Sequence, residues 1–211
     1  SDFVKDLIIT STHDDLLFFT DMGKVYKMKG YEVPEASRTA KGTPVINFLN
    51  LNSGEKVSAV IPVKEFSQDN YLVMITRSGT IKKTPMSEFD SIRKNGLIAI
   101  NLKDGDKLIS VSQSNGDENI YVITKLGKAI AFNENDVRSM GRNAAGVRAI
   151  NLDYGDEVVS MELDIDGTRE MLVVSENGFG KRTSLDEYRL QTRGGKGIAT
   201  YDKSKFSKTG T

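Results

Sequence analysis

The stretch YLVMITRSGTIKKT, residues 71–84, consists of an apolar run, a short turn that contains a glycine, and a second run. This order is typical of a β-hairpin, because glycine adopts at no steric cost the positive φ that a tight turn requires. The same order recurs in LLFFTDMGKVYKM at 16–28, IYVITKLGKAIAF at 120–132 and MLVVSENGFGKRT at 171–183. The sequence therefore predicts four hairpins, with turns at Gly23, Gly79, Gly127 and Gly178.

A second recurring segment follows each hairpin, and we call these segments the first to fourth basic loops. They read SRTAKGTPVI at 37–46, SIRKNGLIAI at 91–100, SMGRNAAGVRAI at 139–150 and QTRGGKGIAT at 191–200. Three of them lead into a further strand, a polar turn and a last strand. Four short strands per repeat, with turn signals between them and no long helical periodicity, predict an all-β fold, a β-propeller of four-stranded blades.

The repeats indicate one domain, residues 1–211, with approximate blades at 7–69, 70–119, 120–169 and 170–211. A β-sandwich is the alternative, since sandwiches also consist of short strands. Sandwiches rarely repeat the chemistry of their loops, whereas all four basic loops here have the same character. We therefore expect the propeller.

Lysine and arginine total 29, and aspartate and glutamate total 29, so attraction to a polyanion depends on where the charges lie. Acidic residues gather in the turns that follow the basic loops. Equivalent residues of successive blades occupy equivalent places around a propeller, so we expect an arc of positive charge. Its members are two cations from each basic loop, none of which contains an acid: Arg38, Lys41, Arg93, Lys94, Arg142, Arg148, Arg193 and Lys196.

Small residues beside these cations would let backbone N–H groups approach a phosphate closely, which makes the basic loops candidate phosphate-binding sites. The alternative is that their glycines only permit turns and that the cations are solvated. The hairpins add four candidate DNA contacts, although lysines on strand edges also deter aggregation. These four are Lys82, Lys83, Lys181 and Arg182.

Composition excludes several kinds of site. The chain has no cysteine and a single His13, which excludes disulfides, thiolate metal sites and a histidine-based catalytic relay. NGFGKRTS at 177–184 departs from the spacing of a phosphate-binding P-loop. We assign no catalytic residue, no metal site and no cofactor to this chain. We find no signal peptide and no apolar run of about 18 residues, and we expect a cytoplasmic protein that does not enter a membrane.

Several stretches carry a likeness to a known family: residues 12–49, 77–84, 155–161, 176–183 and 191–198. They resemble the C-terminal domain of bacterial DNA gyrase A, and the paralogous protein of topoisomerase IV is the nearest rival. The resemblance implies a six-bladed pinwheel, in which neighbouring blades exchange strands and a basic rim wraps double-stranded DNA. It also implies a heterotetramer with gyrase B and the N-terminal region of gyrase A, in which other regions use ATP and Mg²⁺ for negative supercoiling.

The main wrapping motif of that family reads Gln-Arg-Arg-Gly-Gly-Lys-Gly and belongs to its first blade. QTRGGKG at 191–197 matches six of the seven positions, with Thr192 in place of an arginine, but it lies in a later blade. By this likeness the candidate DNA contacts also include Gln191, Arg193, Gly194, Gly195, Lys196 and Gly197.

SDFVKDL at 1–7 is similar to the sequence just after the first blade of the family, and four repeats are present where the family has six. We therefore expect a fragment of a longer protein. The favoured function is a non-catalytic platform that bends DNA for a type II topoisomerase. A propeller that binds partner proteins is the alternative from another class, and a glycan-processing propeller lacks a repeating cluster of carboxylates or aromatics.

Overall fold

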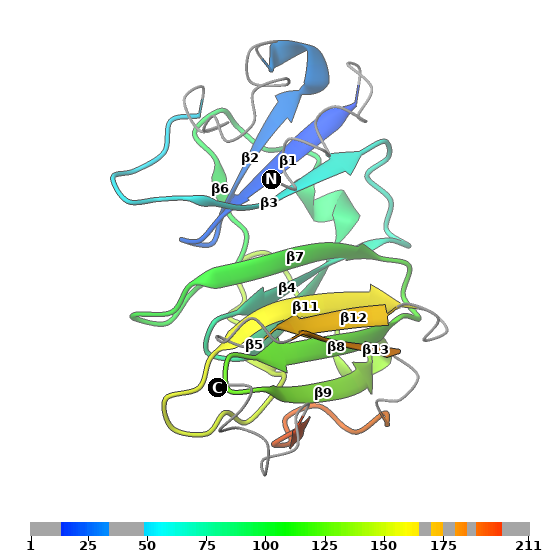
Figure 1. Ribbon diagram of the computed structural model, residues 1–211. Coiled ribbons are helices and arrows are strands. Elements are labelled where there is room, and N and C mark those ends of the chain that lie inside the picture. Colours follow the sequence, from blue (N-terminus) through cyan, green and yellow to red (C-terminus); the bar gives the residue numbers. More distant parts are fainter. Residues whose placement is uncertain (1–13, 34–48, 165–169, 175–179, 185–188, 200–211) are drawn as a thin grey trace.

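The computed structural model describes residues 14–33, 49–164, 170–174, 180–184 and 189–199. Their regular elements are β-strands and short 3-10 helices, and no α-helix occurs among them (Figure 1). The first two hairpins and the strands around them are β1 (Asp15–Thr20), β2 (Lys24–Lys29), β3 (Val57–Val63), β4 (Tyr71–Thr76), β5 (Thr80–Pro85), β6 (Leu97–Ile98) and β7 (Leu108–Ser114).

The remaining strands are β8 (Asn119–Thr124), β9 (Lys128–Asn133), β10 (Val147–Arg148), β11 (Val158–Asp164), β12 (Glu170–Val174), β13 (Gly180–Ser184) and β14 (Ile198–Ala199). The 3-10 helices are η1 (Gly30–Glu32), η3 (Met86–Phe89) and η4 (Glu134–Asp136). In the part of the chain that the structure describes, no helix is long and apolar enough to cross a membrane.

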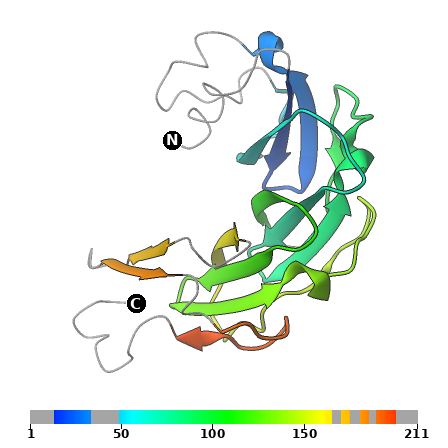
Figure 2. The same cartoon turned by 90° about the vertical axis from the view of Figure 1, so that its right-hand side faces the viewer.

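The strands form three four-stranded antiparallel sheets, in the orders β3-β1-β2-β6, β7-β4-β5-β10 and β11-β8-β9-β14, and the β12–β13 hairpin. We call the three sheets the first to third blades. They follow one another along a curve, with β12 and β13 at its far end (Figure 2). All four predicted hairpins are present, which confirms the all-β fold. Gly23, Gly79 and Gly127 have φ of 79°, 89° and 81°, as the turns require, and Gly178 lies outside the described residues.

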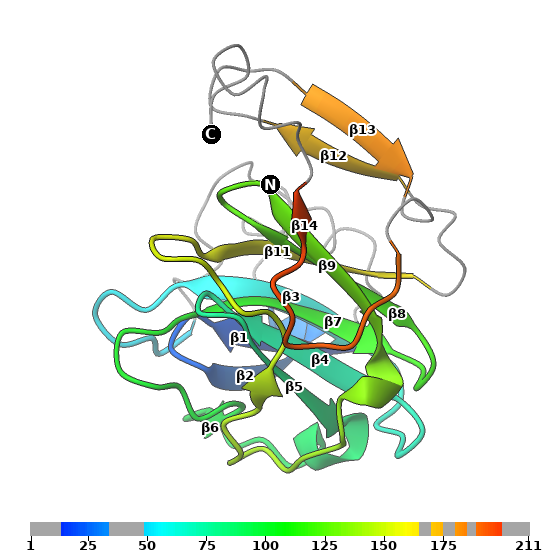
Figure 3. The same ribbon diagram turned by 90° about the horizontal axis from the view of Figure 1, so that it is seen from below.

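The fourth strand of each blade comes from the next repeat along the chain. Each of β6, β10 and β14 pairs with the hairpin of the repeat before its own. The paired residues are Val25 with Leu97, Ile81 with Val147, and Ala129 with Ile198. Figure 3 shows β14 beside β9, which precedes it by more than a whole repeat. This is the strand exchange that the family resemblance implied, and it makes the second, third and fourth basic loops connectors between blades.

Both faces of the second blade are buried, because a neighbouring blade packs on each side. Leu72 and Met74 of β4 lie in a cluster shared with the first blade, and Val73 and Ile75 lie in a cluster shared with the third. A strand covered on both faces reads as a continuous apolar run. Such runs are what the hairpin sequences contain.

Candidate nucleic-acid interface

The second, third and fourth basic loops are hydrogen-bonded to one another in chain order. The amide of Asn101, just after the second loop, donates to the Ala144 carbonyl in the third at 3.3 Å. The amide of Asn151, just after the third, donates to the Gly195 carbonyl in the fourth at 2.8 Å. We call these loops, residues 91–100, 139–150 and 191–199, the basic track. It follows the outer side of the curve formed by the blades (Figure 2).

The cations of the track differ in how far they are exposed. Arg93, Lys94, Arg148 and Lys196 are exposed, and Arg142 and Arg193 are half-buried, as is Gln191. Arg38 and Lys41 of the first basic loop lie outside the described residues. The three hydrogen-bonded loops thus carry six cations that are all at least partly exposed.

Arg193 connects the fourth loop to the third. Its Nε donates to the Asp136 carbonyl at 2.9 Å, and its Nη1 donates to the Arg148 carbonyl at 3.1 Å. A guanidinium has five N–H donors, so these two bonds orient the group and leave others for a ligand. Beside it lies a cavity of 680 Å³ that is lined by Arg148, Arg193 and Lys103, as well as by Gly146 and Gly194. Lys103 was not among the sequence candidates, because it lies in the acidic turn and not in a loop.

Lys196 is held by an acidic side chain. Its Nζ lies 3.2 Å from Asp153 Oδ1, and Lys128 Nζ lies 2.5 Å from Asp153 Oδ2. Hydrogen bonds from Lys128 and then from Lys196 lower the pKa of the Asp153 carboxyl. The carboxylate therefore stays charged and balances part of the positive charge at this end of the track. Lys128 was also missed, although it directly follows the turn glycine of its hairpin.

The glycines that precede the fourth strands have a packing role. Gly146 has φ of 94°, and a Cβ there would lie 2.5 Å from the Ile81 carbonyl oxygen. Gly197 has φ of 73°, and a Cβ there would lie 2.6 Å from the Ala129 oxygen. Only glycine lets the loop approach the neighbouring strand so closely. Gly96 meets the Tyr26 ring in the same way, so these glycines fix the track on the blades whether or not a phosphate binds.

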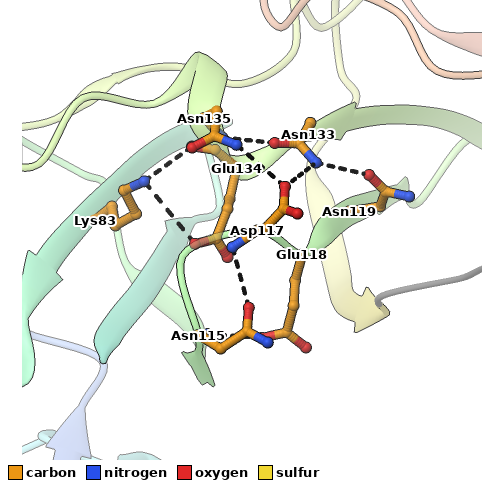
Figure 4. Close-up of polar contacts among 8 residues, drawn as sticks. All are labelled: Lys83, Asn115, Asp117, Glu118, Asn119, Asn133, Glu134 and Asn135. Atoms are coloured by element: carbon orange, nitrogen blue, oxygen red, sulfur yellow. Dashed lines mark hydrogen bonds and ion pairs between the residues drawn. The ribbon is translucent and has the colours of Figure 1, made fainter. Parts of the chain in front are cut away.

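Lys82 and Lys83 do not lie on the predicted surface, which corrects their assignment as DNA contacts. Lys82 is 0% exposed, and its Nζ donates to backbone carbonyls inside the molecule. Lys83 is 6% exposed, and its Nζ donates to the Glu134 carbonyl at 3.2 Å (Figure 4). The same Nζ lies 4.9 Å from the centre of the Tyr71 ring. Their burial leaves neither amine at the surface that a DNA backbone would meet. The structure defines the backbone pairing of β13 with β12, and the side chains of Lys181 and Arg182 lie outside its described part.

Glu134 is buried beside Lys83, with its Oε1 at 3.9 Å from the lysine Nζ (Figure 4). Burial is the main cause that raises the pKa of this carboxyl. Asn133 and Asn135 next to it donate to Asp117, at 3.5 and 3.2 Å. The contact between Lys83 and Glu134 joins β5 of the second blade to η4, which follows β9 of the third. Within the described residues, no group of three or more histidine, cysteine or acidic side chains is placed to hold a metal ion.

The acidic turns have local structural roles. Asp106 Oδ1 accepts from the Ser78 amide at 3.0 Å, and Asp156 Oδ1 accepts from the Leu126 amide at 2.9 Å. Each acid thus binds the turn of the hairpin in its own blade. These contacts hold the Asp106 and Asp156 carboxylates on the hairpin turns, whereas Asp153, in the same turn as Asp156, pairs with the loop cation Lys196.

Comparison with known proteins agrees with this architecture. The family described as "DNA gyrase C-terminal domain, beta-propeller" matches residues 14–64, 70–115, 118–163 and 169–209. The chain belongs to this family. The DNA gyrase A protein of Staphylococcus epidermidis (strain ATCC 12228) is 50% identical over 201 residues, which are 94% of this chain and 22% of that protein. The chain thus spans about a fifth of the curated relatives that it matches.

Two solved structures share the DNA gyrase C-terminal domain fold. The C-terminal domain of DNA topoisomerase IV superposes with a TM-score of 0.81 at 30% identity, over 89% of this chain and 58% of the other. A DNA gyrase A C-terminal domain superposes with a TM-score of 0.74 at 32% identity, over 92% of this chain and 62% of the other. The propeller fold and the gyrase family that the sequence predicted are therefore confirmed.

Proposed function

We propose that the chain binds double-stranded DNA along the basic track and bends it, as part of a DNA gyrase A protein. The observation that carries the proposal is the hydrogen-bonded succession of three acid-free cationic loops on one side of the curved molecule. Duplex DNA presents phosphates at regular intervals, which a continuous cationic surface follows without reading bases. The interaction is therefore expected to depend weakly on sequence.

The free-energy cost of bending DNA favours a binding surface made of several loops over one made of a single loop. Smooth bending of 20 to 30 base pairs by 40° to 90° costs on the order of 1 to 6 kcal/mol, and phosphate contacts must offset that cost. One loop contributes two cations, whereas the described track contributes six: Arg93, Lys94, Arg142, Arg148, Arg193 and Lys196. The first basic loop and the side chains of Lys181 and Arg182 remain proposed contacts, as do Gln191, Gly194, Gly195 and Gly197.

Gyrase is favoured over topoisomerase IV as the parent enzyme by the 50% identity to a DNA gyrase A protein. In that setting the partners are gyrase B and the N-terminal region of gyrase A, in a cytoplasmic heterotetramer. ATP and Mg²⁺ would act in those other regions during negative supercoiling, and this chain would supply only the DNA path.

Ring closure of a DNA fragment of roughly 150 base pairs, about one persistence length, tests the proposal. The chain is expected to speed closure at low salt, because a bent path brings the ends together. Changing both Arg93 and Lys94 to Gln is expected to reduce this effect. The matched control changes Lys29 and Lys64 to Gln, since Lys29 ends β2 and Lys64 follows β3, at the end of the first blade opposite to β6.

Failure of the unchanged chain to speed closure at any salt concentration would contradict DNA bending. Equal losses in the two double variants would show that net charge, and not the track, controls the effect. Binding to a partner protein with no response to DNA would favour the interaction propeller.

A further inference from the structure

Lys82 lies at the junction between the second and third basic loops. It belongs to β5 in the second blade and is 0% exposed. Its Nζ lies 2.5 Å from the carbonyl oxygen of Ala99 in the second loop. It also donates to the carbonyl oxygens of Arg142 and, at 3.3 Å, of Ala144 in the third loop. One ammonium thus bonds to two successive parts of the track.

The number of bonds matches the chemistry of a charged lysine. An ammonium has three donors and no acceptor, and three carbonyl oxygens receive them here. A neutral amine has two donors and a lone pair, so it would leave at least one carbonyl without its bond. Hydrogen bonds from charged donors are also stronger than those between neutral groups. The arrangement is therefore suited to the protonated side chain.

The other blades have different residues at the position equivalent to Lys82. The residue three places after the turn glycine is Tyr26 in the first hairpin and Ile130 in the third. The Tyr26 hydroxyl donates to Glu55 at 3.3 Å, within its own blade, and Ile130 has no side-chain donor. Among the three blades with described side chains, a lysine that bonds two loops therefore occurs only at the middle junction.

We propose that Lys82 is a positioning residue for the DNA path: its ammonium holds the second and third basic loops in register without contacting DNA itself. The loops carry Arg93, Lys94, Arg142 and Arg148, so their spacing sets the spacing of the cations. The DNA half of this inference rests on the proposed function. The ordering of the loops is a property of the free protein and is measured without DNA.

The charged groups that face Lys82 are Glu88 of η3 and Arg142 of the third loop. Burial, as the largest cause, lowers the pKa of Lys82 to about 8, Glu88 raises it and Arg142 lowers it further. The buried ammonium therefore loses its proton at a lower pH than a lysine in water does. Opening of the junction exposes the amine to water, so above about pH 8 opening requires uptake of a proton and is expected to become less favourable.

Lys82→Met tests the role, because methionine keeps an unbranched apolar chain and removes the donors. The matched control is Lys83→Met. Lys83 is the next residue of β5, is also buried, and its Nζ bonds to η4 and not to the track (Figure 4). Both variants lose one positive charge, so a difference between them reports position and not net charge.

The readouts are hydrogen exchange of the Asn101 and Ala144 amides and ring closure of DNA. Lys82→Met is expected to lower protection of these amides by about tenfold, as loss of one charged hydrogen bond predicts. It is also expected to reduce ring closure, while Lys83→Met changes neither. Unchanged amide protection in folded Lys82→Met would overturn the inference. A drop in the salt slope of DNA binding by about 0.9 with unchanged protection would also overturn it, since that identifies a direct phosphate contact.

The unchanged chain provides a test that does not depend on a variant folding. Amide protection at Asn101 and Ala144, corrected for intrinsic exchange rates, is expected to rise between pH 7 and pH 9.5, because opening that exposes Lys82 to water then requires the amine to take up a proton. Protection that stays constant over this range contradicts the inference. Absence of DNA bending by the unchanged chain at neutral pH contradicts the proposed function, and the two failures are thus distinguished.

Discussion

Asp153 forms ion pairs with two lysines from different elements. Lys196 belongs to the fourth basic loop, and Lys128 belongs to the hairpin of the third blade. All three side chains are at least partly exposed, so the group faces the water that a DNA backbone would displace. A phosphate that approaches Lys196 competes with this carboxylate. Asp153 is thus an internal competitor for DNA at the end of the track.

Asp153→Asn is expected to strengthen DNA binding by about two- to fivefold at low salt, because exposed ion pairs have modest effects that salt screens. The measurement is a titration of fluorescent duplex DNA at two salt concentrations. Asp69→Asn serves as a control, since Asp69 is an exposed acid in the loop between β3 and β4 and undergoes the same change of charge. A gain of the same size in both variants would assign the effect to net charge.

Lys82 predicts a second effect, on the pH dependence of folding stability. The unfolded chain keeps the lysine proton up to about pH 10.5, whereas the folded chain releases it near pH 8. Between these values the unfolded state binds more protons, so the free energy of unfolding rises with pH.

Relative to Lys82→Met, the unchanged chain is expected to gain roughly 1 to 3 kcal/mol between pH 8 and pH 10.5. Urea denaturation at a series of pH values measures this difference. Opening of the junction that exposes Lys82 has the same proton linkage, so local protection of the Asn101 and Ala144 amides is expected to rise over the same range. A difference that is constant with pH would show that Lys82 titrates normally.

The elements combine two tasks, since the second, third and fourth basic loops each end in the two-residue strand that completes the preceding blade. The repeated apolar and glycine pattern predicted the hairpins and the blades, because these depend on residues that are close in sequence. Strand exchange came from the family resemblance alone, because it joins residues that lie more than 60 positions apart, such as Val25 and Leu97.

The burial of Lys82 and Lys83 shows what pattern alone could not reveal. From the sequence, both lysines are candidate DNA contacts, although adjacent residues of a strand point to opposite faces. Neighbouring blades cover both faces of β5, and each amine instead bonds to backbone carbonyls there. The loop cations were easier to predict, because loops that contain glycine and no acid generally lie at the surface.

Gly146→Ala tests the close contact between a basic loop and its neighbouring strand. A methyl group would lie 2.5 Å from the Ile81 oxygen at a backbone φ of 94°, so the loop must move or the fold must lose stability. Gly155→Ala is the matched control, since Gly155 has φ of 78° but nothing within 4 Å of its Cβ position. We expect losses of about 3 kcal/mol or more for Gly146→Ala and about 1 to 2 kcal/mol for Gly155→Ala.

Chemical denaturation of both variants measures these losses. Similar losses would mean that φ alone, and not the contact with β5, makes glycine necessary at residue 146. Reduced DNA bending by folded Gly146→Ala would further indicate that the loop position matters for binding.

At the scale of the whole molecule, the chain has zero net charge, but its acidic and basic side chains have different structural roles and lie in different places. Acids such as Asp106 and Asp156 bind backbone amides at the hairpin turns, and Glu134 is buried between blades. The loop cations instead gather along the outer side of the curve. A polyanion close to the track therefore meets a local field that the total charge does not describe.

This separation predicts a strong salt dependence for a neutral protein. If all six cations of the described track contact phosphates, the slope of log affinity against log salt is about −5, because each contact contributes about −0.9. Changing both Arg93 and Lys94 to Gln should then make the slope shallower by about 2, whereas changing Lys29 and Lys64 should leave it unchanged. Fluorescence titrations with duplex DNA between 50 and 200 mM salt, roughly the range in which phosphate contacts are lost, measure these slopes. A slope near −1 for the unchanged chain would exclude the track as the main DNA-binding surface, since a single contact would then account for the whole effect.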